Sequence, residues 1–236
     1  GYEVEERLIS VDELMAELNC ETAFTIPIFG GIPIPESVAV TWVIMAVLVV
    51  VSILLTRNLK VIPTTKRQIL LEFAIEKLNG FFEGILGEAG KKYVPYLATV
   101  AIYIGCANLI GLLGFKPPTK DLNVTAALAL MSIVLIEYSG LRRKGVKGFF
   151  KSFAQPMAIM VPMNILEIGI RPLSLCMRLF GNVLGSFVIM ELVKIIVPVV
   201  VPVPLSLYFD IFDGLIQTYV FVFLTSLFMK EAMDVE

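Results

Sequence analysis

The chain has 236 residues, 57% of them hydrophobic, and a mean hydropathy of +0.86. A soluble domain has about 45–50% apolar residues, so this composition excludes a soluble globular protein, and apolar runs of about twenty residues indicate several membrane-spanning helices. The formal net charge is −2, and the chain has no histidine, which excludes imidazole chemistry. Its three cysteines form no CxxC pair, so we expect no metal site, and no motif indicates a cofactor.

Residues 1–35 form an acidic segment with the character of a soluble chain. Arg7 is their only cation, against seven acidic residues. Proline and glycine in residues 26–33 predict extended chain or a turn. We therefore expect an extracytoplasmic N-terminal segment, followed by a membrane domain over residues 36–236.

The first expected span covers residues 37–56, and a group of basic residues follows it at once. Thr65 and Gln68 then fit a capping box, in which the Thr65 side chain caps a helix and Gln68 reaches back to the Thr65 backbone. The helix that follows, about 66–88, has glutamates close to one face and apolar residues over the rest. This amphipathic pattern predicts a helix that lies in the membrane interface rather than crossing the membrane.

Two further spans are expected at about 94–115 and 123–141, on either side of a short proline-rich loop. A basic cluster at 142–151 follows the second of them. The apolar stretch 154–197 is too long for one upright helix, so we expect it to be broken or strongly tilted. A proline-rich turn leads into the last span, about 205–229, which completes a long helix hairpin.

Together these patterns predict an all-α polytopic membrane protein with about five spans and one interfacial amphipathic helix. Clusters of lysine and arginine mark the cytoplasmic side of such a protein. The basic loops 57–67 and 142–151 are separated by two crossings if helix 66–88 does not cross. The chain is therefore expected to have its N-terminus outside and its C-terminus in the cytoplasm.

A single charge stands in the middle of the apolar run between Arg171 and Glu191, and that charge is Arg178. A guanidinium at that depth costs about 2.5–3.5 kcal/mol, and it cannot lose its proton. It therefore needs a partner, a water-filled cavity or an anionic group on another subunit. On an ideal helix Ser174 and Asn182 share its face, because they lie four residues away on either side.

The other polar groups in the last third of the chain fall into two sets at different depths. Glu191 and Asp210 lie at the outer ends of two apolar segments joined by a short turn, so both are expected to enter one polar cavity open to the outside. Gln217 shares a helix face with Asp210. Glu167 and Asn164 lie nearer the inner end of the fourth stretch. Because the two sets are separated in depth, they predict two polar regions rather than one continuous pore.

Simpler interpretations of these residues remain open. Arg178 can be a structural residue that pairs with Asp213 or Glu167 inside the chain. Glu191 can pair with Lys194, three residues on, or reach the membrane surface from a helix end. Taken alone, the polar residues support only an ion-handling membrane protein.

Three segments carry a resemblance to subunit a of bacterial F-type ATP synthase. Residues 171–182, RPLSLCMRLFGN, resemble the signature of this family, a Pro-x-Ser-Leu step followed by Arg-Leu-Phe-Gly-Asn. Residues 118–125, PTKDLNVT, resemble the loop before its next span, and residues 215–221, LIQTYVF, resemble its last helix. Order and spacing agree over nearly the whole chain after residue 36.

The resemblance implies a stator subunit of a rotary ATP synthase, which is not itself an enzyme. Two offset half-channels would pass H⁺ or Na⁺ to and from the carboxylates of the rotor c-ring, and so couple ion flow to ATP synthesis. Arg178 would be the stator arginine that faces this ring, with Gln217 as its neighbour across the helix hairpin. The resemblance assigns the outer half-channel to Asn182, Glu191, Asp210 and Asp121, and the inner one to Glu167 and Asn164.

The implied partners are the c-ring, the peripheral-stalk subunit b, the other ATP synthase subunits and the lipid bilayer of a bacterial cell membrane, with no nucleic acid. Two positions depart from the family: Phe187 stands where members often carry glutamate or histidine, and Asp210 stands where some carry histidine. The alternative is a secondary transporter or channel that binds an anionic solute through Arg178. That class predicts an internal repeat, and the sequence shows none. The choice between H⁺ and Na⁺ stays open at this point.

Overall fold

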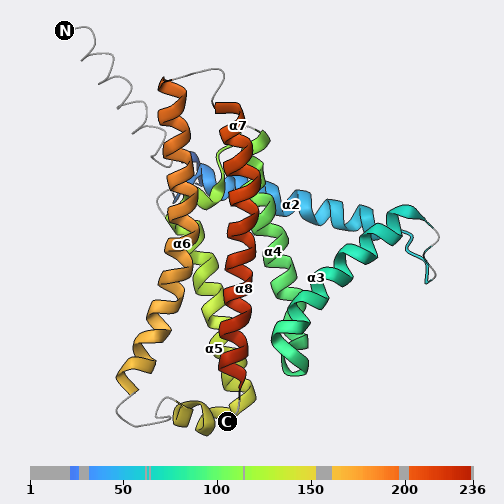
Figure 1. Cartoon of the computed structure of the whole chain (residues 1–236), viewed down its shortest axis with the longest axis vertical. Helices are drawn as coiled ribbons and strands as arrows, with labels where there is room; N and C mark the ends of the chain where they lie inside the picture. The colour runs from blue at the N-terminus through green and yellow to red at the C-terminus, as the bar shows by residue number, and fades with distance from the viewer. Residues whose placement is uncertain are drawn as a thin grey trace.

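A computed structural model describes most of the membrane domain and little of the N-terminal segment. Its described residues are 22–26, 32–61, 63, 65–113, 115–152, 161–196 and 202–234. Five helical stretches among them are long and apolar enough to cross a membrane. The expected all-α polytopic architecture is therefore confirmed, and Figure 1 shows its long helices packed as a bundle.

A short antiparallel hairpin precedes the first long helix. Strand β1 (Thr22–Ile26) pairs with β2 (Ile32–Pro35), so that Ile26 faces Ile32. These strands agree with the extended chain expected within residues 26–33. Residues 1–21, with the acidic residues, and residues 27–31 lie outside the described part of the chain.

Helix α2 (Glu36–Thr56) coincides with the first expected span and begins directly after Pro35. It has little contact with the rest of the chain, because Ile44 is its single buried residue. In Figure 1 α2 extends sideways from the bundle. Its side chains are mostly valine, isoleucine and leucine, so in a membrane lipid or other subunits cover them.

Helix α3 (Lys66–Gly90) confirms one half of the expected capping box and contradicts the other. The Thr65 hydroxyl accepts a hydrogen bond from the Gln68 backbone N–H at 3.4 Å. The Gln68 amide does not reach back to Thr65; its Nε2 donates instead to Lys60 O and Glu72 Oε1, both at 2.6 Å. The chain before the helix lies close enough for Lys60 to bind this amide. The prediction that Gln68 bonds back to the Thr65 backbone is therefore wrong.

The end of α3 joins the bundle. Gly87 adopts φ 66°, a left-handed conformation that favours glycine, and it bends the helix there. The last turns pack against α8, with Phe82 and Leu86 buried, while the first half is mostly exposed apart from the buried Gln68. A 3₁₀ turn, η1 (Lys91–Tyr93), leads on to α4 (Val94–Leu109) and the turn η2 (Ile110–Leu113). The interfacial position of helix 66–88 stays a prediction.

Helix α5 (Leu122–Ser152) follows a 3₁₀ turn, η3 (Pro118–Lys120). It is longer than the expected span 123–141, because the helix continues through the basic cluster. Gly145, with φ 70°, bends it beyond the apolar part. Charged residues propagate a helix as readily as apolar ones, so hydropathy marks the end of a span and not the end of a helix.

Helix α6 (Val161–Ile196) covers the described part of the fourth stretch, and its 36 residues run unbroken through Pro172. Residues 154–160 and 197 of that stretch lie outside the described part of the chain. At about 1.5 Å per residue α6 is longer than the roughly 30 Å hydrocarbon core, which agrees with a tilted helix that extends beyond the core. The returning segment consists of α7 (Pro202–Ser206), the π-helix η5 (Leu207–Asp213) and α8 (Gly214–Met233).

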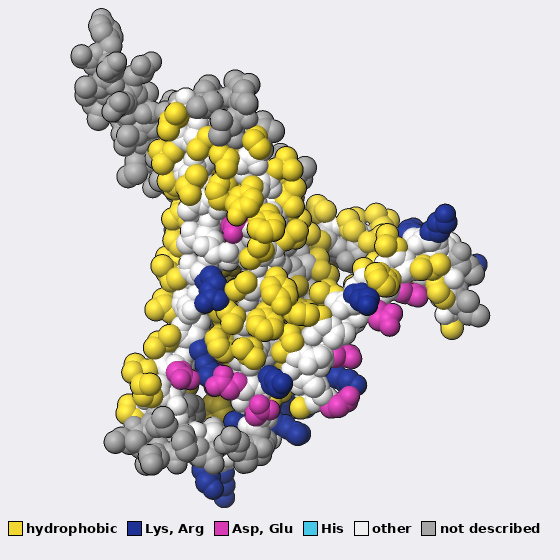
Figure 2. All heavy atoms as spheres, viewed as in Figure 1, with side chains coloured by type: hydrophobic (Ala, Val, Ile, Leu, Met, Phe, Trp, Pro, Cys, Tyr) yellow, Lys and Arg dark blue, Asp and Glu magenta, His cyan; other side chains and the backbone are white. Residues whose placement is uncertain are grey.

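The hydrophobic core lies where α4, α5, α6 and α8 meet, together with the end of α3. Leu97, Ile104, Ile136 and Met229 are completely buried there. The outer surface is also apolar over most of the face shown in Figure 2, where charged side chains gather toward the lower end and along the arm at the right, and only isolated charges lie higher on the bundle itself. This distribution is that of a protein whose surface contacts lipid.

Candidate functional site

Arg178 lies on an outward-facing side of α6. Its neighbours Leu175 and Leu179 are buried in the core, whereas Arg178, Ser174 and Asn182 are all exposed. The shared face expected from helical spacing is therefore confirmed. It points out of the chain and not into the bundle.

Arg178 makes no hydrogen bond and no ion pair with any residue that the structure describes. The two carboxylates considered for an internal pair have other partners: Glu167 pairs with Arg171 at 2.9 Å, and Asp213 accepts a hydrogen bond from Ser186 at 3.4 Å. The structural interpretation of Arg178 is thus contradicted. A permanent cation thus stands on the outward face of α6 without an ion-pair partner among the described residues.

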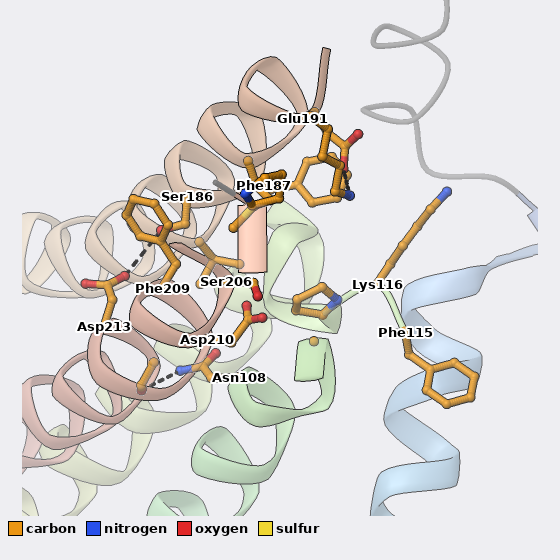
Figure 3. A pocket seen from close by; sticks show the side chains of 17 residues that line it. Asn108, Phe115, Lys116, Ser186, Phe187, Glu191, Ser206, Phe209, Asp210 and Asp213 are labelled. Carbon is orange, nitrogen blue, oxygen red and sulfur yellow. Dashed lines mark hydrogen bonds and ion pairs between the residues drawn. The ribbon is translucent and has the colours of Figure 1, made fainter. Parts of the chain in front are cut away.

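Glu191 and Asp210 line the same cavity, of about 360 Å³, as the sequence predicts (Figure 3). The cavity lies between the C-terminal part of α6, the segment α7–η5 and the end of α4. Its polar lining includes Asn108, Lys116, Ser186, Glu191, Lys194, Ser206, Asp210 and Asp213.

The two carboxylates have different surroundings. Glu191 Oε1 accepts from Lys194 Nζ at 2.6 Å, so the pairing considered from sequence is present. Asp210 has no such direct partner among the described residues, and Lys194 acts on it only through its charge. Asp210 therefore differs from Glu191 in that no described residue forms an ion pair with it.

The π-helix η5 determines where Asp210 sits. The wider turn of a π-helix is defined by hydrogen bonds between residues five apart, and the Gly214 N–H donates such a bond to Phe209 O. Asn108, buried on α4, holds the end of this segment: its Nδ2 donates to Gly214 O at 3.0 Å and to Thr218 Oγ1 at 3.4 Å. Thr119 donates to Asn108 Oδ1 at 2.9 Å.

Sequence reasoning missed Asn108. An amide inside the apolar run 94–115 was the available signal, because a buried amide needs several hydrogen-bond partners.

A hydrogen-bonded path leads from the cavity to Gln217. Asp213 lines the cavity and accepts from Ser186 Oγ and from Gln217 Nε2, both at 3.4 Å. Gln217 itself is buried, at 8% exposure. Asp213 thus joins the cavity to the interior face of α8, a role that sequence spacing alone did not assign to it.

Two of the residues assigned to the outer half-channel do not line this cavity. Asp121 is buried and caps α5, since its carboxylate accepts from Asn123 N–H at 2.9 Å and from the Ser37 hydroxyl. Asn182 lies on the exposed Arg178 face. Phe187 does line the cavity, where the Lys120 ammonium stands 4.0 Å from its ring centre.

The residues assigned to the inner side lie on the first third of α6. Asn164 is half-buried and Glu167 is exposed. Arg171, which sequence reasoning treated only as the start of a motif, binds Glu167 and also Glu231 of α8, each at 2.9 Å.

Comparison with known proteins places the chain among relatives of one kind. The sequence pattern of the ATP synthase A chain family matches residues 38–230. The chain is 38% identical over 197 residues to ATP synthase subunit a of Moorella thermoacetica, which covers 83% of this chain and 89% of that relative. It is 38% identical over 205 residues to ATP synthase subunit a 2 of Bradyrhizobium sp., covering 86% and 91%. It is 33% identical over 216 residues to the sodium ion specific ATP synthase subunit a of Propionigenium modestum, covering 85% and 74%.

Proposed function

Because the chain belongs to the ATP synthase A chain family, we propose that Arg178 is its stator arginine and faces the carboxylates of a rotor c-ring. The protein is a multi-pass, non-catalytic membrane subunit of an ATP synthase that takes part in ion translocation. One observation carries the proposal: Arg178 is exposed on α6, and no described residue of the chain pairs with it.

The proposed reaction cycle needs no covalent chemistry in this chain. An ion from the outer side neutralises a ring carboxylate, which lets that carboxylate rotate into lipid. When it returns beside Arg178, the guanidinium favours its ionised form, because an opposite charge within about 4–6 Å stabilises a carboxylate. The same fixed cation repels an ion that would cross directly. The membrane potential supplies about 2.3 kcal/mol per charge per 100 mV.

We assign the outer ion path to the cavity that Asp210 and Glu191 line. From there Asp213 and the buried Gln217 carry the polar path toward α6. The inner path is assigned to Glu167 and Asn164. The amide of Gln217 suits this position, since it can donate and accept hydrogen bonds without adding a charge.

The proposed assembly places the subunit in a bacterial cell membrane beside the c-ring and the peripheral-stalk subunit b, with its N-terminus outside and its C-terminus in the cytoplasm. The large exposed apolar surface of α2 supports a lipid or subunit contact on that side. The solute transporter considered as an alternative is not favoured, because the family match covers 38–230 and names a different class.

The test replaces Arg178 and a matched arginine outside the site. Arg178→Ala is expected to abolish ion-driven ATP synthesis in membrane vesicles while the complex still assembles. Arg178→Lys is also expected to be severely impaired, because lysine lacks the planar fork and can shed its proton when desolvated. Arg143→Ala, in the exposed basic cluster of α5, is the control and should synthesise ATP at the parental rate. ATP synthesis by Arg178→Ala near the parental rate would contradict the assignment of Arg178 as the stator arginine.

A further inference from the structure

A second arginine connects the two helices that carry the site. At the lower end of Figure 1, where α6 begins and α8 ends, the two helices stand apart. Arg171 of α6 spans this separation: its Nη2 lies 2.9 Å from Glu167 Oε2 on its own helix and 2.9 Å from Glu231 Oε1 on α8. Its guanidinium also stands 5.1 Å from the centre of the Phe228 ring.

The burial of the three charged groups differs. The Arg171 side chain is 17% exposed, whereas Glu167 and Glu231 are 49% and 60% exposed. The guanidinium is therefore enclosed between the helices, with the carboxylates on its open side. From α5, the half-buried Glu137 also acts on Arg171, and Lys144 acts in turn on Glu137. Two carboxylates from two helices thus bind one cation directly, and the charge of a third, on α5, acts on it from a greater distance.

Stability alone does not account for this arrangement. Ion pairs with half-exposed carboxylates contribute little to stability, because water solvates both partners in the absence of the pair. A planar guanidinium held between two carboxylates and an aromatic ring does fix geometry. The ion pairs with Glu167 and Glu231 therefore contribute more to the position of α6 relative to α8 than to the stability of the protein.

The position of Arg171 relates this geometry to the ion path. Arg178 lies two turns further along α6, about 10 Å away along the helix axis. Gln217 lies on α8, the helix that also carries Glu231 in its last turn. Leu175 and Leu179 are buried in the core and anchor α6 beyond Arg171, so losing Arg171 frees only the inner third of the helix.

We propose that Arg171 is a positioning residue for the inner half of the ion path. By binding Glu167 and Glu231 together, it holds the inner end of α6 at a fixed separation from α8 and keeps the Glu167 carboxylate in place. This inference rests on the proposed function, because it concerns the ion path that Arg178 divides.

The test is a double-mutant cycle with a conservative variant. Arg171→Gln and Glu231→Gln are each expected to lower ion-driven ATP synthesis per assembled complex by about three- to tenfold, the range in which loss of a coupling contact acts. The double variant should be no slower than the slower single one, because both changes remove one contact. Arg171→Lys should lose less activity than Arg171→Gln but stay below the parental rate, since a lysine restores the charge between the two carboxylates without the planar fork.

Lys230→Gln, next to Glu231 and exposed, is the control and should leave the rate unchanged. The inference would be overturned if Glu231→Gln made ATP at the parental rate. It would also be overturned if the fold-losses of the two single variants multiplied in the double variant, because the two residues would then act independently. If Arg171→Gln fails to accumulate in the membrane, Glu231→Gln decides alone, since it leaves α6 intact. Arg178→Ala separates the two claims: if it is inactive while Glu231→Gln is normal, only the positioning role fails.

Discussion

The carboxylate of Asp210 rests against Gly111, so closely that a β-carbon on Gly111 would lie 2.9 Å from Asp210 Oδ1 and 3.2 Å from its Cγ. The two residues come from different helical segments, η2 and η5, at the wall of the cavity. A side chain at position 111 would therefore displace the Asp210 carboxylate from its place in the cavity.

Gly111→Ala is therefore expected to slow ion flux several-fold and to destabilise the protein by about 1–3 kcal/mol, the usual result of an overpacked contact. Flux is measured in vesicles under an imposed potential, and stability by thermal unfolding in detergent. Gly105→Ala, also on the α4 side, is the matched control, because its β-carbon would meet Thr218 only at 3.8 Å, an ordinary contact. Equal flux in the two variants would contradict the proposed fit of Asp210 against Gly111.

Asn108→Ala tests the hydrogen bonds that hold the end of the π-helix. The substitution leaves Gly214 O and Thr119 Oγ1 without this partner, at an expected cost of about 1–3 kcal/mol. It should also lower ion flux, since Asp210 lies on the segment that Asn108 holds. The readouts are thermal unfolding of the purified complex and flux per assembled complex. Asn79→Ala, at a half-buried position on α3, should change neither.

Glu191→Gln and Asp210→Asn test the two carboxylates of the cavity. Each is expected to slow ion uptake, and the double variant should be slower than either, because two carboxylates together attract a cation more strongly than one. Asp210→Asn should have the larger effect, since Lys194 already neutralises Glu191. The measurement is ion flux into vesicles against external pH.

Glu88→Gln provides the matched control for Glu191→Gln. Glu88 is also a glutamate paired with a lysine three residues on, Lys91, at 2.7 Å, but it is exposed and lies outside the cavity. If the double variant conducts ions at the parental rate, the outer ion path does not pass Glu191 and Asp210, and Asp121 is the next candidate.

The orientation of the chain is testable with single cysteines in a background that lacks Cys20, Cys106 and Cys176. A cysteine at Arg142, exposed on α5, should react with an impermeant reagent only from the cytoplasmic side. A cysteine at Phe115, which is 58% exposed, should react only from outside. The buried Lys120 is less suitable as a site for this label. Labelling of both positions from the same side would overturn the five-span orientation.

The sequence by itself determined the all-α, multi-span architecture and the residues that share one face of α6. Hydropathy is a local property, so the first span could be placed within a residue of α2. A helix repeats about every 3.6 residues, and this period put Ser174, Arg178 and Asn182 on one face before any packing was known. The cost of a charge in lipid then marked Arg178 as a residue that needs a partner.

Only the tertiary structure decided which polar groups meet. Packing between helices far apart in the chain brings together three pairs of residues: Gly111 with Asp210, Asn108 with Gly214, and Arg171 with Glu231. No local periodicity encodes such contacts, because the rotation and separation of two helices depend on every side chain between them. The same reason explains why Gln68 bonds to Lys60 rather than to its own cap, and why Asp121 caps α5 instead of lining the cavity.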